Sequence, residues 1–169
     1  MNSKVEEILN RQIAAEASSS QLYLSMASWA ECHGINGTAK FLYLHSDEER
    51  EHMLKLVRFV NERGGTAIIP AIDSPKSDFD SLRQLFVLLL EHEIKVTEMI
   101  NEVVHVCLQE KDYTTHNFMQ WFVAEQLEEE ALAREIVDKL NMIGDDKGGL
   151  YLFDRDIEMM QTSANAPQN

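Results

Sequence analysis

The 169-residue chain is 44% hydrophobic and 26% charged, which fits one compact domain with a sizeable core. Its 15 basic and 29 acidic side chains give a formal net charge of -14, which disfavours binding to nucleic acid or anionic membranes and favours cations. It has neither a signal-peptide core at its start nor an apolar run of about 20 residues, so we expect a cytoplasmic protein. The two cysteines, Cys32 and Cys107, lack the CxxC spacing of a rubredoxin-type centre and are expected to be reduced core residues.

Four long segments repeat apolar residues at intervals of seven, which places those residues on one face of a helix. The first two segments cover about 4–32 and about 36–63, and the second two about 80–109 and about 113–142. A short turn joins the members of each pair, so each pair is predicted to form an antiparallel hairpin. Helices of this length, roughly 42 to 45 Å, bury their apolar faces most simply as an all-α four-helix bundle.

The segment between the two hairpins, about 64–79, contains two of the three prolines and is predicted to be extended. Its roughly 16 residues could reach about 50 Å, the length of the bundle, so the second and third helices can run parallel. An up-and-down bundle with a loose loop is the alternative. After a pair of glycines, a short fifth helix is predicted at about 149–160, followed by a disordered tail at about 161–169. All 169 residues are thus expected to form one domain.

Each of the four long helices interrupts its apolar stripe with one glutamate near mid-length, at Glu16, Glu49, Glu93 and Glu129. Counting from the hairpin turns places these residues at a similar height in the bundle. Several buried carboxylates at one level cannot all stay ionised without compensation, because burying an unpaired charge is costly. A single glutamate on an apolar face is usually a snorkelling or hydrogen-bonded residue, but four at one level favour a multivalent cation.

The carboxylates belong to a pattern that both halves of the chain repeat. Each half has two polar residues 33 positions apart and a third polar residue three positions after the second. The residues concerned are Glu16, Glu49 and His52 in the first half, and Glu93, Gln126 and Glu129 in the second. Glutamates combined with Glu-x-x-His are typical of di-iron and di-manganese bundles, because side chains at i and i+3 converge on one face. Oxygen-rich ligation with little nitrogen and no sulfur suits iron or manganese.

Other polar residues near this level have less defined roles. Tyr23, one heptad after Glu16, is either ordinary core or a hydroxyl that bonds a ligand carboxylate and donates an electron. His45 shares a helix column with His52 but lies two turns away, so we expect a satisfied core histidine. The remaining histidines are expected at the surface: His33, His92, His105 and His116.

Several motifs are distributed over nearly the whole chain: Glu16 with Tyr23, SDEEREHM at 46–53, NFMQWFVAEQLEEE at 117–130 and GGLYLFD at 148–154. Together they resemble the bacterial non-haem ferritins. The resemblance implies a ferritin-like four-helix bundle and a homo-oligomeric hollow shell of twenty-four subunits, whose fifth helix lines fourfold axes. It also implies iron storage, in which Fe(II) is oxidised with O2 or H2O2 and ferric oxyhydroxide is deposited inside the shell.

The resemblance further implies a ferroxidase centre that holds two iron ions. The first iron site would use Glu16, Glu49 and His52. Glu49 would bridge to a second site completed by Glu93 and Glu129, with Gln126 at its border. A third iron site of the family would match Glu48, Glu125, Glu128 and Glu129. Tyr23 would be the redox-active tyrosine, with Trp121 as its neighbour, and would act with Glu49 and His52 in catalysis.

The sequence differs from the motifs of several related families. Haem-binding bacterioferritins carry a second Glu-x-x-His and a methionine after the bridging glutamate, whereas this chain has Gln126-x-x-Glu129 and Arg50, so no haem is expected. Rubrerythrin-like proteins would need a CxxC iron domain. Two other functions are alternatives. A di-iron monooxygenase would need a substrate pocket and a reductase. A purely structural bundle would fold fully without metal, and its buried acids would show raised pKa values.

Overall fold

The computed structural model describes the chain from Met1 to Ala164, and this part contains α-helices without β-strands. In chain order the helices are α1 (Ser3–Cys32), α2 (Asn36–Glu62), α3 (Leu82–Gln109), α4 (Tyr113–Ile143) and α5 (Lys147–Ala164). None of these helices combines the length and the apolarity that crossing a lipid bilayer requires. Residues 165–169, which belong to the predicted tail, lie outside the described residues.

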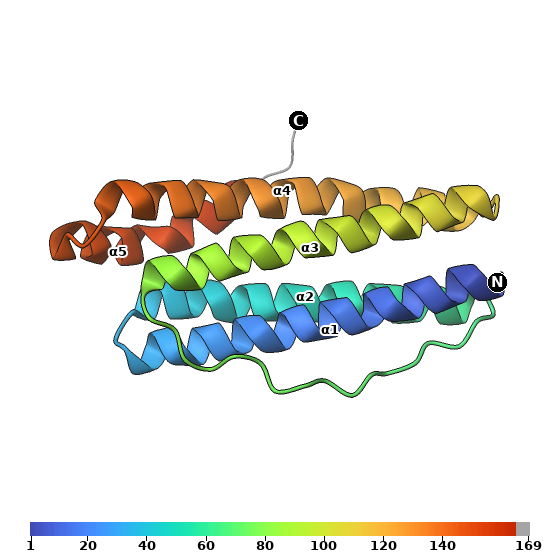
Figure 1. The fold of residues 1–169 in the computed structure, drawn as a ribbon, viewed down its shortest axis with the longest axis horizontal. Helices are drawn as coiled ribbons and strands as arrows, with labels where there is room; N and C mark the ends of the chain where they lie inside the picture. Colours follow the sequence, from blue (N-terminus) through green and yellow to red (C-terminus); the bar gives the residue numbers. More distant parts are fainter. Residues whose placement is uncertain (165–169) are drawn as a thin grey trace.

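The four long helices form two antiparallel hairpins that lie side by side (Figure 1). α1 packs along α2, α3 packs along α4, and the two hairpins meet through α1 and α3. The extended segment between α2 and α3 returns along the outside of the bundle to the end where α2 began, so α2 and α3 run parallel (Figure 1). The predicted all-α bundle with one long crossover is therefore confirmed, and the up-and-down alternative was wrong.

The core consists of two apolar clusters at opposite ends of the bundle, each contributed by all four long helices. One contains Tyr23, Phe41, Phe86 and Ile136 and extends to α5 through Phe153. The other lies toward the N-terminus and is built from residues such as Leu9, Val60, Ile100 and Phe122. The predicted glutamates fall between the two clusters in sequence on every helix, so a polar layer interrupts the core at mid-length.

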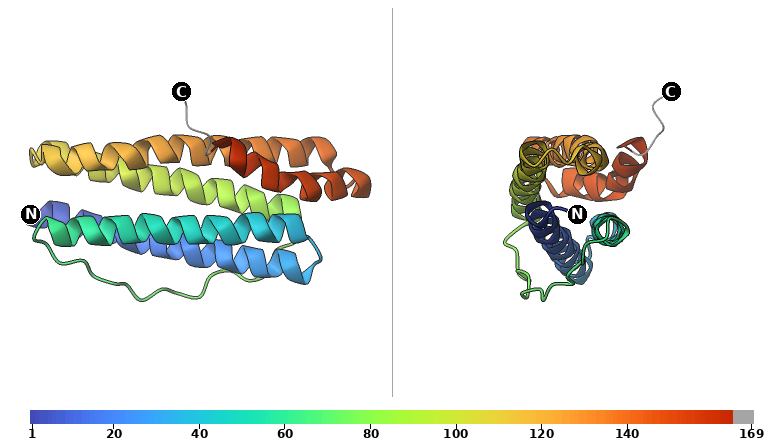
Figure 2. Two further views of the ribbon diagram at one scale, coloured as in Figure 1. Left: turned by 180° about the vertical axis from the view of Figure 1, so that it is seen from behind. Right: turned by 90° about the vertical axis from the view of Figure 1, so that its right-hand side faces the viewer.

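α5 lies against α2 and α4, on the side of the bundle opposite the seam between α1 and α3 (Figure 2). It begins at Lys147, earlier than the predicted start after the glycine pair, because the Asp146 carboxylate accepts a hydrogen bond from the Gly149 backbone N–H at 2.6 Å and caps the first turn. It also continues to Ala164, beyond the predicted end at about 160, and its residues Phe153, Ile157 and Met160 pack against the bundle. The expected tail is therefore helical over residues 161–164.

The two cysteines differ in their surroundings, and one expectation was wrong. Cys107 is buried in the cluster near the N-terminus, as predicted, and burial raises the pKa of its thiol to about 11. Cys32 is exposed, because it is the last residue of α1 and the chain leaves the bundle directly after it.

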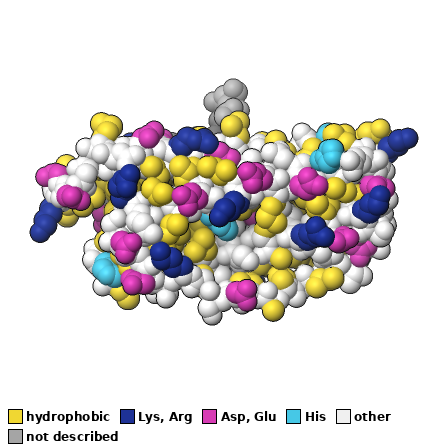
Figure 3. Space-filling view, viewed as in Figure 1, with side chains coloured by type: hydrophobic (Ala, Val, Ile, Leu, Met, Phe, Trp, Pro, Cys, Tyr) yellow, Lys and Arg dark blue, Asp and Glu magenta, His cyan; other side chains and the backbone are white. Residues whose placement is uncertain are grey.

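On the face of the molecule drawn in Figure 3, acidic, basic and apolar side chains are interspersed over the helices.

Candidate metal centre

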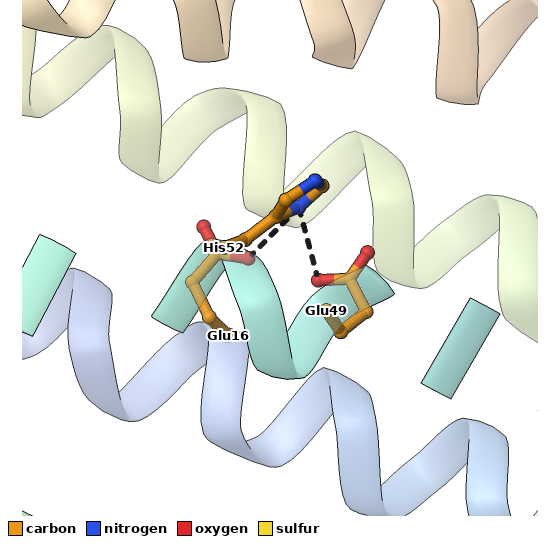
Figure 4. A group of neighbouring side chains, drawn as sticks. All are labelled: Glu16, Glu49 and His52. Carbon is orange, nitrogen blue, oxygen red and sulfur yellow. Dashed lines mark ion pairs between the residues drawn. The ribbon is translucent and has the colours of Figure 1, made fainter. Parts of the chain in front are cut away.

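Two carboxylates and one imidazole converge in the polar layer between α1 and α2. Glu16 comes from α1, and Glu49 and His52 lie one helical turn apart on α2 (Figure 4). His52 Nδ1 lies 3.9 Å from Glu16 Oε2 and 3.8 Å from Glu49 Oε2. Glu16 and Glu49 are only 1% and 4% exposed. Ligand atoms of the three residues all lie within 4.8 Å of one another, so this group could hold a metal ion.

The third predicted carboxylate, Glu93 of α3, is held by two donors of its own. The Tyr23 hydroxyl donates to Glu93 Oε1, and Gln126 Nε2 donates to Glu93 Oε2 at 2.5 Å. Gln126 Nε2 also reaches the Glu93 backbone carbonyl at 3.1 Å. Tyr23 therefore bonds a carboxylate at this level, and its role as an electron donor stays a prediction.

Burial and mutual repulsion perturb the acids of this layer. Burial raises the pKa of Glu93 to about 8, and the charge of Glu129 adds to the increase. Burial also raises the pKa of Glu49 well above its usual range, with further increases from Glu16. Glu93 therefore holds a proton at neutral pH unless a cation replaces it, and the raised pKa of Glu49 favours its protonated form. A layer of this kind binds either protons or metal.

The fourth predicted carboxylate, Glu129 of α4, belongs to a second group that the sequence did not indicate. His45 Nε2 lies 3.4 Å from Glu129 Oε2, and His45 Nδ1 lies 3.7 Å from Glu48 Oε2. The ligand atoms of these three residues also lie within 4.8 Å of one another. Although burial alone would raise the pKa of Glu129, the hydrogen bond and charge of His45 lower it. His45 is a buried histidine, as expected, but it faces two carboxylates as well as backbone.

A cavity of about 530 Å³ lies between α2 and α4 and reaches both groups. Its lining includes His45, His52 and the four residues expected at a third iron site, Glu48, Glu125, Glu128 and Glu129. Burial raises the pKa of Glu125, and the charge of Glu128 adds to the increase. The Lys55 ammonium lies 3.1 Å from the centre of the Trp121 ring, which makes a T-shaped contact with the His52 imidazole. The cavity is therefore a polar approach to the centre.

The structure brings the predicted residues to one level but does not gather them into one group. Within the described part of the chain, the compact groups of ligand side chains are Glu16, Glu49 and His52, and His45, Glu48 and Glu129. Glu93 and Gln126 lie beside Tyr23, and Glu125 and Glu128 line the cavity.

Sequence reasoning missed two polar neighbours of the centre. Gln12 is 1% exposed and donates to Glu16 Oε1 at 2.8 Å from one turn earlier in α1. His92 was expected at the surface, but it is half-buried, with Nε2 2.7 Å from Ser19 Oγ and its ring against Tyr23. Burial, with a smaller effect of Lys95, lowers the pKa of His92 to about 4. The small side chain of Ser19 leaves room for it, and only a pairing of α1 with α3 could have indicated this contact.

Comparisons with known proteins agree with these observations. A family model described as a ferritin-like domain matches residues 6–143. The chain is 44% identical over 164 residues to a probable bacterial non-haem ferritin-like protein of Haemophilus influenzae, covering 97% of this chain and 99% of that protein. A bacterial non-haem ferritin of Campylobacter jejuni is 41% identical over 163 residues, with 96% and 98% covered.

A solved structure extends the similarity to three dimensions. An open-pore ferritin from the archaeon Archaeoglobus fulgidus superposes with a TM-score of 0.92 at 45% identity, over 94% of this chain and 97% of that one. The match covers the four-helix bundle and most of the remaining chain. The chain therefore belongs to the ferritin family, and its resemblance to the bacterial non-haem ferritins is confirmed.

Proposed function

We propose that this chain is an iron-storage ferritin that oxidises Fe(II) at the carboxylate layer and deposits ferric oxyhydroxide inside a hollow homo-oligomeric shell in the cytoplasm. One observation carries the proposal: Glu16, Glu49 and His52 converge in a nearly dry core. Buried acids with raised pKa values favour a cation that replaces their protons. Oxygen-rich ligands with one nitrogen suit iron as the substrate ion.

The proposed ferroxidase centre holds two Fe(II) ions. The first ion binds Glu16, Glu49 and His52, and Glu49 bridges to a second ion bound by Glu93 and Glu129, with Gln126 at its border. Two Fe(II) ions each give up one electron to one O2, which takes up two protons and leaves as H2O2. The pKa of Glu93, about 8, and the raised pKa of Glu49 favour protons on these acids, which metal entry displaces and the reduction of O2 can take up.

Tyr23 is proposed to take part in electron transfer. Its hydroxyl is fully buried and donates to Glu93, so an electron can leave the ring while the phenol proton passes to that carboxylate. This electron, together with one from the proposed third Fe(II) ion, would reduce H2O2 with two protons to two water molecules. Trp121, which contacts His52, is a second aromatic group beside the centre.

The cavity between α2 and α4 is the proposed route between the centre and the interior of the shell. Glu48, Glu125, Glu128 and Glu129 line it and are the proposed ligands of a third iron ion. The mixed acidic and basic lining suits hydrated cations rather than an apolar organic substrate, which favours iron storage over a monooxygenase. A shell of twenty-four subunits would also cover apolar residues that are exposed on α5, such as Tyr151 and Met159.

The test is an anaerobic Fe(II) titration of the purified protein, followed by a pulse of O2 and ultracentrifugation. We expect two to three bound iron ions per chain, the first of them tightly held, fast oxidation and a large particle that fills with ferric ions. Glu49→Ala should slow oxidation by at least about 100-fold, because Glu49 is the proposed ligand of both ions. His105→Ala, at an exposed position on α3, is the matched control and should oxidise iron like the parent. Stoichiometric binding without mineral, in a small oligomer, would contradict storage.

A further inference from the structure

A lysine and a tryptophan are in contact at the wall of the cavity between α2 and α4. The Lys55 ammonium of α2 lies 3.1 Å from the centre of the Trp121 ring of α4, well within the roughly 6 Å range of a cation–π contact. Both side chains are half-buried, and both line the cavity. The contact therefore holds a positive charge over an aromatic ring in a partly dry place.

A carboxylate on the same wall favours the charged form of the lysine. Burial lowers the pKa of Lys55, and the charge of Glu125 opposes this decrease. Glu125 lies one turn after Trp121 on α4 and lines the same cavity. Lys55 thus interacts with a ring and with a carboxylate of α4.

Trp121 and Tyr23 are two oxidisable side chains that each contact a proposed iron ligand. The Trp121 ring makes a T-shaped contact with the His52 imidazole, with 5.2 Å between the two centroids. The Tyr23 hydroxyl donates a hydrogen bond to the Glu93 carboxylate. The geometry around the centre therefore offers two sources of a single electron, one indole and one phenol.

Loss of an electron changes the charge of the two rings differently. When Tyr23 gives up one electron and its phenol proton passes to Glu93, the ring becomes a neutral radical. When Trp121 gives up one electron, the indole becomes a radical cation that faces the Lys55 ammonium at 3.1 Å. Like charges at this distance repel, and partial burial strengthens the repulsion. The ammonium therefore opposes the oxidation of Trp121.

We propose that Lys55 determines which aromatic side chain supplies the electron, because its charge keeps Trp121 reduced and leaves Tyr23 as the donor. The inference rests on the proposed function, in which one electron from Tyr23 and one from the third Fe(II) ion reduce H2O2, with two protons, to two water molecules. Without the ammonium, the same H2O2 would take its electron from Trp121, and the indole N–H proton would then pass to water in the cavity. Lys55 acts on the reaction only through the ring.

The first measurement needs no iron. In the assembled, metal-free protein with Trp29→Phe, Trp121 is the only tryptophan. Pulse radiolysis with trimethoxybenzene as the reference couple measures the equilibrium between the oxidised reference and oxidised Trp121. Lys55→Met, which keeps the length of the side chain and removes its charge, should shift this equilibrium toward oxidised Trp121 by at least about 10-fold. Lys55→Gln is a second neutral variant, and Lys55→Arg should match the parent because it keeps the charge.

A second lysine provides a matched control for the change in net charge. The Lys76 ammonium lies 5.5 Å from the centre of the Phe79 ring, and Phe79 belongs to the apolar cluster at the opposite end of the bundle from the cluster that Trp121 joins. Lys76→Met therefore also removes one positive charge from an aromatic contact, but far from Trp121. It should leave the equilibrium as in the parent.

The second measurement locates the radical during iron oxidation. Samples frozen after anaerobic Fe(II) loading and a pulse of O2 are examined by electron paramagnetic resonance, with deuterated tryptophan to identify the indole signal. The parent should show a tyrosyl radical that Tyr23→Phe removes. Lys55→Met should increase the indole signal by at least about 10-fold at the expense of the tyrosyl signal, and Lys55→Arg should restore the parent spectrum.

The outcomes separate this inference from the proposed function. An unchanged equilibrium in both Lys55→Met and Lys55→Gln overturns the inference, whether or not the protein oxidises iron. An equal shift in Lys55→Arg also overturns it, since shape and not charge would then be responsible. A radical that stays on Tyr23 in Lys55→Met has the same consequence. A shifted equilibrium with no aromatic radical in any variant supports the effect of Lys55 on Trp121 and counts against electron donation by Tyr23.

Discussion

The two hairpins repeat one pattern in sequence but use it differently in space. In the α1–α2 hairpin, Glu16, Glu49 and His52 converge on one point. In the α3–α4 hairpin, Glu93 turns to Tyr23 and Gln126, while Glu129 turns to His45. The partners that separate Glu93 from Glu129 include two residues of the first hairpin, Tyr23 and His45. The repeat therefore fixes the height of each carboxylate, and the neighbouring helix fixes its direction.

This asymmetry gives the two proposed iron sites different strengths. The first site has a nitrogen ligand and two carboxylates that already lie close together, so these side chains need to move little when a metal ion binds. The second site needs Glu93 and Glu129 to leave existing hydrogen-bond partners before they can share an ion. A tight first ion and a weak second ion suit a storage protein, because the oxidised product must leave the centre.

Matched substitutions in the two hairpins should have unequal effects on metal binding. His52→Ala removes the only nitrogen of the first site and should weaken binding of the first Fe(II) ion by about 100-fold. Gln126→Ala, at the corresponding level of the second hairpin, should leave that ion within about threefold of the parent, because Gln126 contacts Glu93 and not the first group. Anaerobic Fe(II) titration measures both. Equal losses in the two variants would mean that the halves act as one symmetric site.

A second effect is expected in the pH dependence of the metal-free protein. Burial raises the pKa of Glu93 to about 8, from 4.5 for an ordinary glutamate. Between these values the folded protein holds a proton that the unfolded chain has released. This contribution to stability is full below about pH 4.5 and is lost as the pH rises to about 8, at a cost on the order of 5 kcal/mol in the free energy of unfolding.

Urea unfolding with a chelator at pH 5 and pH 8 measures this loss. Glu93→Gln should reduce the difference between the two pH values, since the amide does not titrate. Zn²⁺ in place of the chelator should restore stability at pH 8, because a cation then compensates the ionised acids. A parent protein as stable at pH 8 as at pH 5, without metal, would show that the layer stays solvated.

Sequence periodicity predicted the bundle because each long helix needs one apolar face, and that requirement leaves a seven-residue repeat. The length of the proline-containing segment allowed the crossover topology, but the up-and-down alternative stayed open until the structure excluded it. The level of the four glutamates followed from counting along antiparallel helices. Each of these features depends on one helix or on one pair of neighbours in sequence, so the chain alone carries the information.

The direction of each polar side chain could not be obtained in the same way. His45 is assigned to the core by its column, but its contact with Glu129 depends on the distance between α2 and α4. His92 reaches Ser19 only because α1 and α3 pack closely at that level. Burial of a polar residue was thus predictable where periodicity decides it, whereas its partner came from helices that are distant in sequence.

The smallest predicted effect concerns how the two hairpins begin their second helices. α4 starts with its own cap, because the Asp112 carboxylate accepts from the Thr115 backbone N–H at 3.0 Å. α2 has no side-chain cap at Ile35, and the Asp154 carboxylate of α5 instead accepts from the backbone N–H groups of Gly37 and Thr38 at 3.2 and 2.7 Å. The first hairpin is therefore completed by α5.

Asp154→Ala should cost about 1 kcal/mol in the free energy of unfolding, the usual loss for a helix cap, and should increase hydrogen exchange at the start of α2 and along α5 together. Gly37→Ala gives a second route to the same contact, because a Cβ at this position would overlap the backbone carbonyl oxygen of Asp154 and push α5 away. Hydrogen exchange at the start of α4 is the internal control and should not change in either variant. Faster exchange in α5 with unchanged exchange in α2 would show that α2 begins without help from Asp154, and that the two hairpins are alike in this respect.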